Sequence, residues 1–164
     1  MNFKSITYGQ LDLTEIPDKL LHFYDERKVF GTPFHLIIGT DSQTKKETKI
    51  VTVIAIVCEG HGGIFFYTSK TVPMITNLAR KLETETGDSL LVATELLEEL
   101  ESDNFSEFME NVPITIHIDA GNTPRNKTKS LIDGLVGWVT ATGLQCEIKP
   151  DSFVASTIAD RISK

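Results

Sequence analysis

The sequence predicts an α/β fold in a single domain, residues 1–164, built on a mixed five-stranded sheet that is flanked by helices. Three strand-like runs follow one another early in the chain, and two later strand-like runs are each preceded by a helical stretch. Strands joined by short turns pair antiparallel, whereas strands joined through helices pair in parallel by right-handed crossovers. A length of 164 residues with 40% hydrophobic residues suits one sizeable core.

The first 31 residues are predicted to form an extra N-terminal helix ahead of a core at 34–164. Thr14 is a suitable N-cap, and the segment Gly31-Thr32-Pro33 is a typical helix end. Apolar residues recur between them at helical spacing: Ile16, Leu20, Leu21 and Tyr24.

The first three strands are expected at 34–40, 50–58 and 63–68. A polar stretch, 42–49, separates the first two, and a glycine-rich turn, 60–63, separates the second pair. Connections this short predict a three-stranded antiparallel meander.

The rest of the chain is predicted to alternate between helices and strands. Gly87 is a point at which the first long helix could bend, and Gly143 is placed as the stop of the second. The expected elements are a helix at 73–101, a short helix or loop at 104–111, a strand opened by Pro113, a helix at 127–140, a strand at 144–149 and a terminal helix from Ser152. The predicted order is therefore β-β-β-α-β-α-β-α after the N-terminal helix.

The negative charge of the chain is concentrated in one segment. The net charge is −7, but residues 83–110 hold ten Asp and Glu residues and no Lys or Arg, which leaves the rest of the chain at +3. A local basic face for nucleic acid is therefore compatible with the overall charge.

Cysteine usage and hydropathy indicate the cellular compartment of the protein and whether it is associated with a membrane. Cys58 and Cys146 both lie in apolar strand patterns, which is typical of reduced, packed thiols in a cytoplasmic protein, and two cysteines are too few for a zinc site. No stretch approaches the ~20 apolar residues of a membrane span, so no membrane role is expected.

Two predicted strands run directly into an aspartate, Asp41 and Asp119, and a third does nearly the same at Asp151. Ends of neighbouring strands lie about 5 Å apart, so these carboxylates can converge, and like charges then repel unless a cation lies between them. Oxygen-only clusters of this kind suit Mg²⁺ or Mn²⁺, and such metals usually serve phosphate chemistry. Each aspartate could instead be an ordinary turn residue.

Three short segments resemble the YkuK-like bacterial family of predicted ribonuclease H-like nucleases. They are Gly39-Thr40-Asp41-Ser42-Gln43, Ile116-His117-Ile118-Asp119 and Ile148-Lys149-Pro150-Asp151-Ser152. The resemblance covers residues 34–164. It implies a ribonuclease H-like fold, shared with Holliday-junction resolvases and ribonuclease H, and a divalent metal held by carboxylates.

Ribonuclease H-like sites usually add a glutamate from the first crossover helix, and helix geometry selects Glu85 here. At about 100° per residue, Glu85 falls within the apolar stripe of this helix, whereas Glu95 lies roughly 110° from its centre. Glu83 and Glu98 lie further away still. A break at Gly87 would instead turn Glu85 into water.

The fourth carboxylate is expected to be Asp151 rather than Asp160. Asp151 directly follows a strand that should be parallel to those ending in Asp41 and Asp119, so all three would emerge at one sheet edge. Asp151 is also a natural N-cap for the last helix. Asp160 lies nine residues further on and reaches the site only if that helix crosses it.

Arg125, Lys127 and Lys129 follow Asp119 closely and could contact substrate phosphates, or they could belong to a solvated loop. His117 lies on an apolar strand and is interpreted as a core histidine.

The leading hypothesis is a metal-dependent nuclease that hydrolyses nucleic-acid phosphodiester bonds with Mg²⁺ or Mn²⁺, the metal ions held by Asp41, Glu85, Asp119 and Asp151. The alternative is a non-catalytic ribonuclease H-like module that binds nucleic acid or a protein partner. A phosphotransferase is disfavoured, because no Gly-x-x-x-x-Gly-Lys loop is present.

Overall fold

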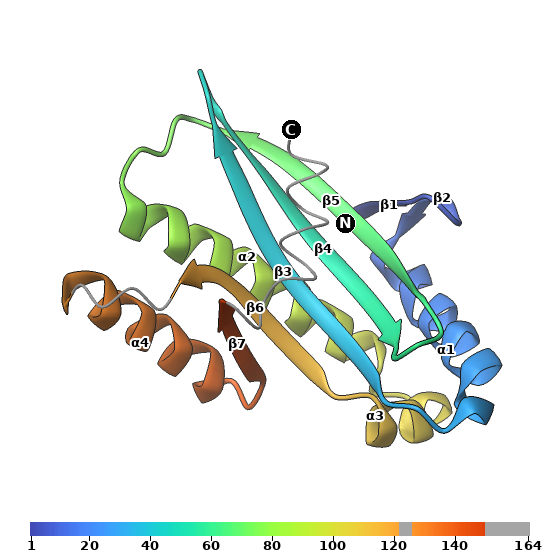
Figure 1. Ribbon diagram of the computed structural model, residues 1–164. Coiled ribbons are helices and arrows are strands. Elements are labelled where there is room, and N and C mark those ends of the chain that lie inside the picture. Colours follow the sequence, from blue (N-terminus) through green and yellow to red (C-terminus); the bar gives the residue numbers. More distant parts are fainter. Residues whose placement is uncertain (122–125, 150–164) are drawn as a thin grey trace.

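The computed structural model describes residues 1–121 and 126–149, which form an α/β structure around one mixed sheet of seven strands (Figure 1). The strand order is β2-β1-β5-β4-β3-β6-β7. The strands are β1 (Asn2–Ser5), β2 (Gly9–Asp12), β3 (Phe34–Thr44), β4 (Thr48–Cys58), β5 (Gly63–Val72), β6 (Ile114–Gly121) and β7 (Gln145–Lys149). β6 pairs in parallel with both β3 and β7, and the other pairings are antiparallel.

Four α-helices accompany the sheet in this part of the chain: α1 (Ile16–Arg27), α2 (Leu78–Glu99), α3 (Ser106–Asn111) and α4 (Asn126–Ala141). The order of elements from β3 to β7 follows the predicted alternation, and Gly143 follows α4 with a φ of 83°. The predicted terminal helix from Ser152 lies outside the described residues.

The sheet has two strands more than the five expected, because residues 1–31 are not only helical. β1 and β2 form a hairpin that buries Phe3 and Leu11 and joins the sheet beside β5. These strands have four residues each, too few for a clear alternating pattern. The predicted Thr14 N-cap is also wrong: the Asp12 side chain accepts a hydrogen bond from the Thr14 backbone N–H.

β3 and β4 continue beyond the predicted ends, so that the polar stretch 42–49 is mostly strand. Their pairing extends to Thr44 opposite Thr48, whose hydroxyl groups lie 2.9 Å apart. The Thr48 hydroxyl accepts a hydrogen bond from the Ile75 backbone N–H at 2.8 Å. The segment 73–77 is therefore fixed to the hairpin, and α2 begins at Leu78 rather than at Pro73.

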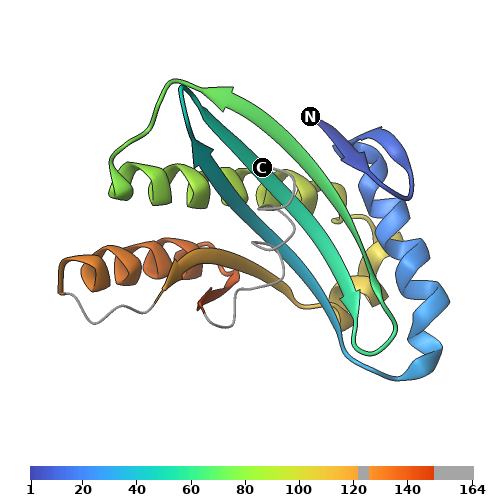
Figure 2. The ribbon, with the colours of Figure 1, turned by 45° about the horizontal axis from the view of Figure 1, so that its top comes forward.

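The helices pack on one face of the sheet. Apolar residues of α1, α2, α3 and α4 join strand residues such as Ile38, Ile54 and Ile116 in one core, and α2 lies across the strands with α4 beside it (Figure 2). A smaller cluster on the opposite face contains Val51, Val53 and Ala55, each at most 1% exposed.

Two hydroxyl-mediated contacts hold α2 on β3. Thr40 contacts the Ser89 hydroxyl at 2.8 Å and the Thr52 hydroxyl at 2.9 Å, and Ser42 donates a hydrogen bond to the Glu85 carboxylate at 2.6 Å. Two strand residues advance by about 6.6 Å and four helix residues by about 6 Å. The two contacts therefore have matching spacings on the strand and on the helix, which run antiparallel. Together they fix the position of α2 along its axis and its rotation about that axis.

Gly87 does not bend α2, which is continuous through it. A Cβ atom at this position would lie 3.2 Å from the Trp138 ring, which is 44% exposed and can shift outward. We expect Gly87→Ala to raise the free energy of unfolding by about 0.5–1 kcal/mol, because alanine is the better helix former. Urea denaturation measures this gain, and a loss of stability would mean that the contact with Trp138 cannot relax.

Candidate functional site

Asp41 and Asp119 lie where two parallel strands diverge. The ladder between β3 and β6 runs from Leu36 with Ile114 to Gly39 with His117, and each aspartate comes two residues after that last pair. Beyond it the strands separate (Figures 1 and 2). We call this divergence, with Asp41 and Asp119 on its two arms, the carboxylate fork.

Glu85 comes to the fork from α2. Its side chain is 5% exposed, lies in the core-facing stripe that the helical spacing predicts, and accepts the hydrogen bond from Ser42. The Lys81 ammonium, one turn earlier, lies 3.7 Å from the Glu85 Oε1 atom. The rival Glu95 is half-buried, and Glu83 is exposed. The helix therefore presents Glu85 to the sheet, and its role as a metal ligand stays a prediction.

The electrostatics of Glu85 connect it with both aspartates. The pKa of Glu85 is raised from 4.5 to about 7, mainly by burial, whereas the hydrogen bond from Ser42 and the charge of Lys81 act to lower it. The negative charges of Asp41 and Asp119 each contribute to the rise. Asp41 and Asp119 thus each lie near enough to Glu85 for their charges to act on its carboxylate.

Lysines balance part of this charge. The Lys149 ammonium, at the end of β7, lies 2.5 Å from the Asp119 Oδ1 atom. Asp119 is 19% exposed and Lys149 is 51% exposed at their side chains. Apart from this ion pair, the buried Asp119 Oδ1 atom has no polar partner among the described residues.

The donor chemistry fits Mg²⁺ or Mn²⁺, because the fork offers hard carboxylate oxygens, among them an Asp119 oxygen that only Lys149 contacts in the described part of the chain. However, no three His, Cys, Asp or Glu side chains within residues 1–121 and 126–149 are grouped closely enough to hold a metal together. Side chains alternate along a strand, so Asp41 leaves β3 on the face opposite Ser42, to which Glu85 is bonded. Two faces of the sheet thus contribute to the fork.

Asp151, its rival Asp160 and Arg125 lie outside the described residues. Lys127 is in the first turn of α4, and Lys129, in the same helix, is exposed.

His117 is 6% exposed, with its Nε2 atom 3.4 Å from the Glu147 carboxylate, which agrees with its interpretation as a core residue. Its strand, β6, is an interior strand of the sheet, between β3 and the edge strand β7.

Sequence reasoning missed the three partners of the carboxylates: Ser42, Lys81 and Lys149. Lys81 could have been found from its i,i+4 spacing to Glu85. Ser42 and Lys149 lie within the segments that suggested the family, but only the pairing of strands and the docking of α2 bring them to Glu85 and Asp119.

Among the described helices, none combines the length and the apolar character that crossing a membrane requires.

The raised pKa of Glu85 predicts a pH-dependent stability in metal-free protein. The folded state holds the Glu85 proton between the unfolded pKa of about 4.5 and the folded value of about 7, so stability falls as the pH rises through this window and levels off above it. The expected loss is about 3 kcal/mol. Urea denaturation in EDTA should show that Glu85→Gln removes most of this decline and that the exposed control Glu83→Gln keeps it. An unchanged decline in Glu85→Gln would contradict the buried carboxyl.

Comparisons with known proteins agree with the family that the motifs suggested. A family model described as "Ribonuclease H-like" matches residues 15–164. The chain is also 28% identical over 170 aligned positions to "Uncharacterized protein YkuK" of Bacillus subtilis (strain 168), covering 99% of this chain and 96% of that protein. No solved structure matches significantly. The family match over most of the chain, together with the mixed sheet and its crossover helices, shows that the chain belongs to the ribonuclease H-like family.

Proposed function

We propose that this protein is a divalent-metal-dependent nuclease that hydrolyses nucleic-acid phosphodiester bonds. The observation that carries the proposal is Glu85, a buried carboxylate within electrostatic reach of Asp41 and Asp119 at the carboxylate fork. Burying a carboxylate beside two others is unfavourable unless a proton or a cation compensates. Membership of the ribonuclease H-like family supports a role on nucleic acid.

Each carboxylate has a distinct part in the proposal. Asp41 and Asp119 would hold the cation from the two strands and Glu85 from α2, with Asp151 as the fourth ligand. A bound Mg²⁺ or Mn²⁺ would supply a hydroxide nucleophile near neutral pH and neutralise charge on the phosphate. Ser42 would orient Glu85 through its hydrogen bond, whose hydroxyl donor leaves the second carboxylate oxygen for the metal.

A second candidate is a non-catalytic module that binds nucleic acid or a protein partner. The observation that favours it is the absence of a closed three-ligand group within residues 1–121 and 126–149, together with the lysines that already pair with Glu85 and Asp119. Metal-dependent cleavage separates the two candidates, because a module without catalysis would hydrolyse no phosphodiester bond.

Metal binding is expected to stabilise the protein. At about one hundred times its dissociation constant, Mn²⁺ should raise the free energy of unfolding by about 2.7 kcal/mol, or the melting temperature by about 5–10 °C. Asp41→Asn and Asp119→Asn should each remove most of this shift, whereas Asp18→Asn, an exposed acid on α1, should keep it. Differential scanning calorimetry measures the shift.

The same variants should be assayed on a panel of DNA and RNA substrates with Mg²⁺ and Mn²⁺. Cleavage that is lost in Asp41→Asn supports the nuclease, and Asp151→Asn should lose it while Asp160→Asn retains most of it. The reverse result would make Asp160 the fourth ligand. A metal response that is equal in all variants contradicts the site, and metal binding without cleavage of any substrate favours the non-catalytic module.

Lys127 and Lys129, with Arg125, are proposed to contact phosphates of the bound nucleic acid. Replacing each by Ala should weaken binding with little sequence dependence and lower the salt slope by about one unit per contact. Lys4→Ala is the control, since Lys4 is exposed on β1, which lies near the opposite edge of the sheet from β6. Fluorescence anisotropy over a salt series measures the slope, and an unchanged slope in the Lys127 and Lys129 variants would place these residues outside the interface.

A further inference from the structure

Lys149 and Lys81 each pair with one carboxylate of the site, but their contacts differ. The Lys149 ammonium lies 2.5 Å from the Asp119 Oδ1 atom, whereas the Lys81 ammonium lies 3.7 Å from the Glu85 Oε1 atom, which already accepts the Ser42 hydrogen bond. Lys149 is thus the cation in closest contact with a site carboxylate among the described residues.

The Asp119 Oδ1 atom is a natural seat for a cation. It is buried, and apart from the Lys149 ammonium it has no polar partner among the described residues. The charges of Asp119 and Asp41 both act on Glu85 nearby. An ammonium and a divalent cation cannot occupy the same place beside one oxygen, because they repel each other and need the same lone pair. Lys149 and a metal ion are therefore competitors for Asp119.

We infer that Lys149 is an exchangeable counter-cation: it neutralises Asp119 in the metal-free protein, and it turns to a phosphate of the nucleic acid once a divalent cation binds. The inference rests on the proposed function. Lysine suits this exchange, because its ammonium is a point charge on a flexible stem. The Lys149 side chain is 51% exposed, so that it can leave Asp119 without repacking the core.

The position of Lys149 explains how its released ammonium can still contact a phosphate at the site. It ends β7, in register with Gly121 and beside the strand that carries Asp119. A lysine displaced from Asp119 remains within one side-chain length of the metal that replaces it. A phosphate bound to that metal would then lie within its reach, and a charge-assisted contact would follow.

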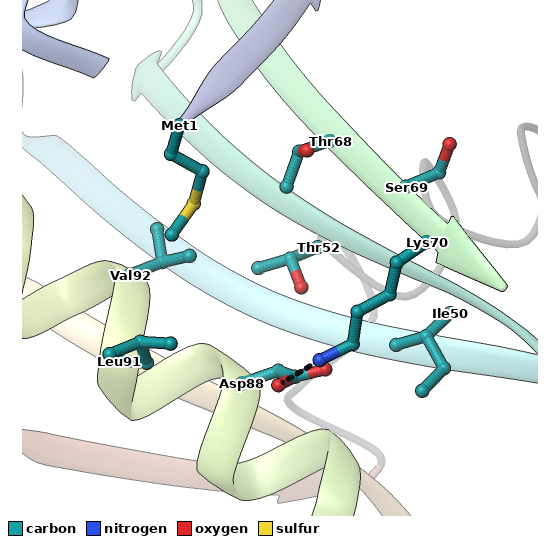
Figure 3. Close-up of a pocket in the computed structure, with 9 residues that line it drawn as sticks. All are labelled: Met1, Ile50, Thr52, Thr68, Ser69, Lys70, Asp88, Leu91 and Val92. Atoms are coloured by element: carbon teal, nitrogen blue, oxygen red, sulfur yellow. Dashed lines mark hydrogen bonds and ion pairs between the residues drawn. The ribbon is translucent and has the colours of Figure 1, made fainter. Parts of the chain in front are cut away.

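The chain contains a matched ion pair away from the fork. Lys70 on β5 lies 2.6 Å from Asp88 on α2, with side chains 52% and 16% exposed, nearly the values of Lys149 and Asp119. This pair borders a pocket of about 220 Å³ between α2, β4 and β5 (Figure 3). Lys70→Met therefore removes an ion pair of the same kind without touching the carboxylate fork.

The experiment is a calorimetric titration of Mn²⁺ into the full chain and its variants. Lys149→Met should bind Mn²⁺ about tenfold more tightly than wild type, because a competing positive charge is gone. Lys70→Met should stay within about twofold of wild type, and Lys149→Arg, which keeps the charge, should bind no more tightly than wild type. The arginine variant also controls for any loss of structure on removing the side chain.

A second measurement tests the exchange to phosphate. The salt dependence of binding to a short duplex is recorded with Ca²⁺ as the bound divalent cation, and again in EDTA, which removes divalent cations. Lys149→Met should lower the slope by about one unit with Ca²⁺ and leave it unchanged in EDTA, where Lys149 is paired with Asp119. Lys70→Met should change neither slope.

The possible failures are distinguishable. If wild type and Lys149→Met bind Mn²⁺ equally, or if Lys70→Met tightens binding as much, the inference is wrong while the metal site stands. If Lys149→Met lowers the slope equally with and without Ca²⁺, Lys149 contacts nucleic acid but does not exchange. If neither wild type nor any variant binds Mn²⁺, both the inference and the proposed function are overturned.

Discussion

The candidate site depends on the docking of α2 across β3. Thr40 with Ser89, and Ser42 with Glu85, are two polar contacts inside an otherwise apolar interface. Apolar packing alone tolerates sliding and rotation, because many arrangements bury a similar area. Directional hydrogen bonds do not, since a shifted helix would leave buried hydroxyl groups and a carboxylate without partners. These contacts thus convert a generic helix–sheet interface into one that presents a single glutamate at a defined place.

The cost of that arrangement is electrostatic. A carboxylate that is 5% exposed and lies near two further carboxylates favours its protonated form, which is why its pKa rises to about 7. The lysines reduce the repulsion without removing it, because their contacts with Glu85 and Asp119 come from half-exposed side chains that water screens. The candidate site is therefore electrostatically unfavourable within a well-packed molecule, which is typical of functional sites.

The sequence predicted the alternation of strands and helices, the placing of Asp41 and Asp119 on neighbouring parallel strands, and the burial of Glu85, because these follow from local periodicity and from the order of the elements. Both aspartates lie within β3 and β6, which continue past the predicted strand ends. It could not reveal the β1–β2 hairpin, whose strands are too short for a pattern and are stabilised by joining β5. It also could not reveal the pairing of Lys149 with Asp119, because that contact requires the register of β6 with β7, including its irregularity between Ile118 and Gly121. Whether Asp41, Glu85, Asp119 and Asp151 bind a metal stays a prediction.

The matched spacing of the two contacts between α2 and β3 also limits where related chains can gain or lose residues. Glu85 and Ser89 are one helical turn apart and face residues two apart on the strand. Inserting one residue between them would rotate Glu85 by about 100° relative to Ser89, away from Ser42. The turn at Gly60 and Gly62 is not part of this helix–strand spacing. Both glycines lie on the surface and adopt positive φ. Insertions and deletions are therefore expected to accumulate at that turn and to spare the four-residue interval that links the helix to the strand.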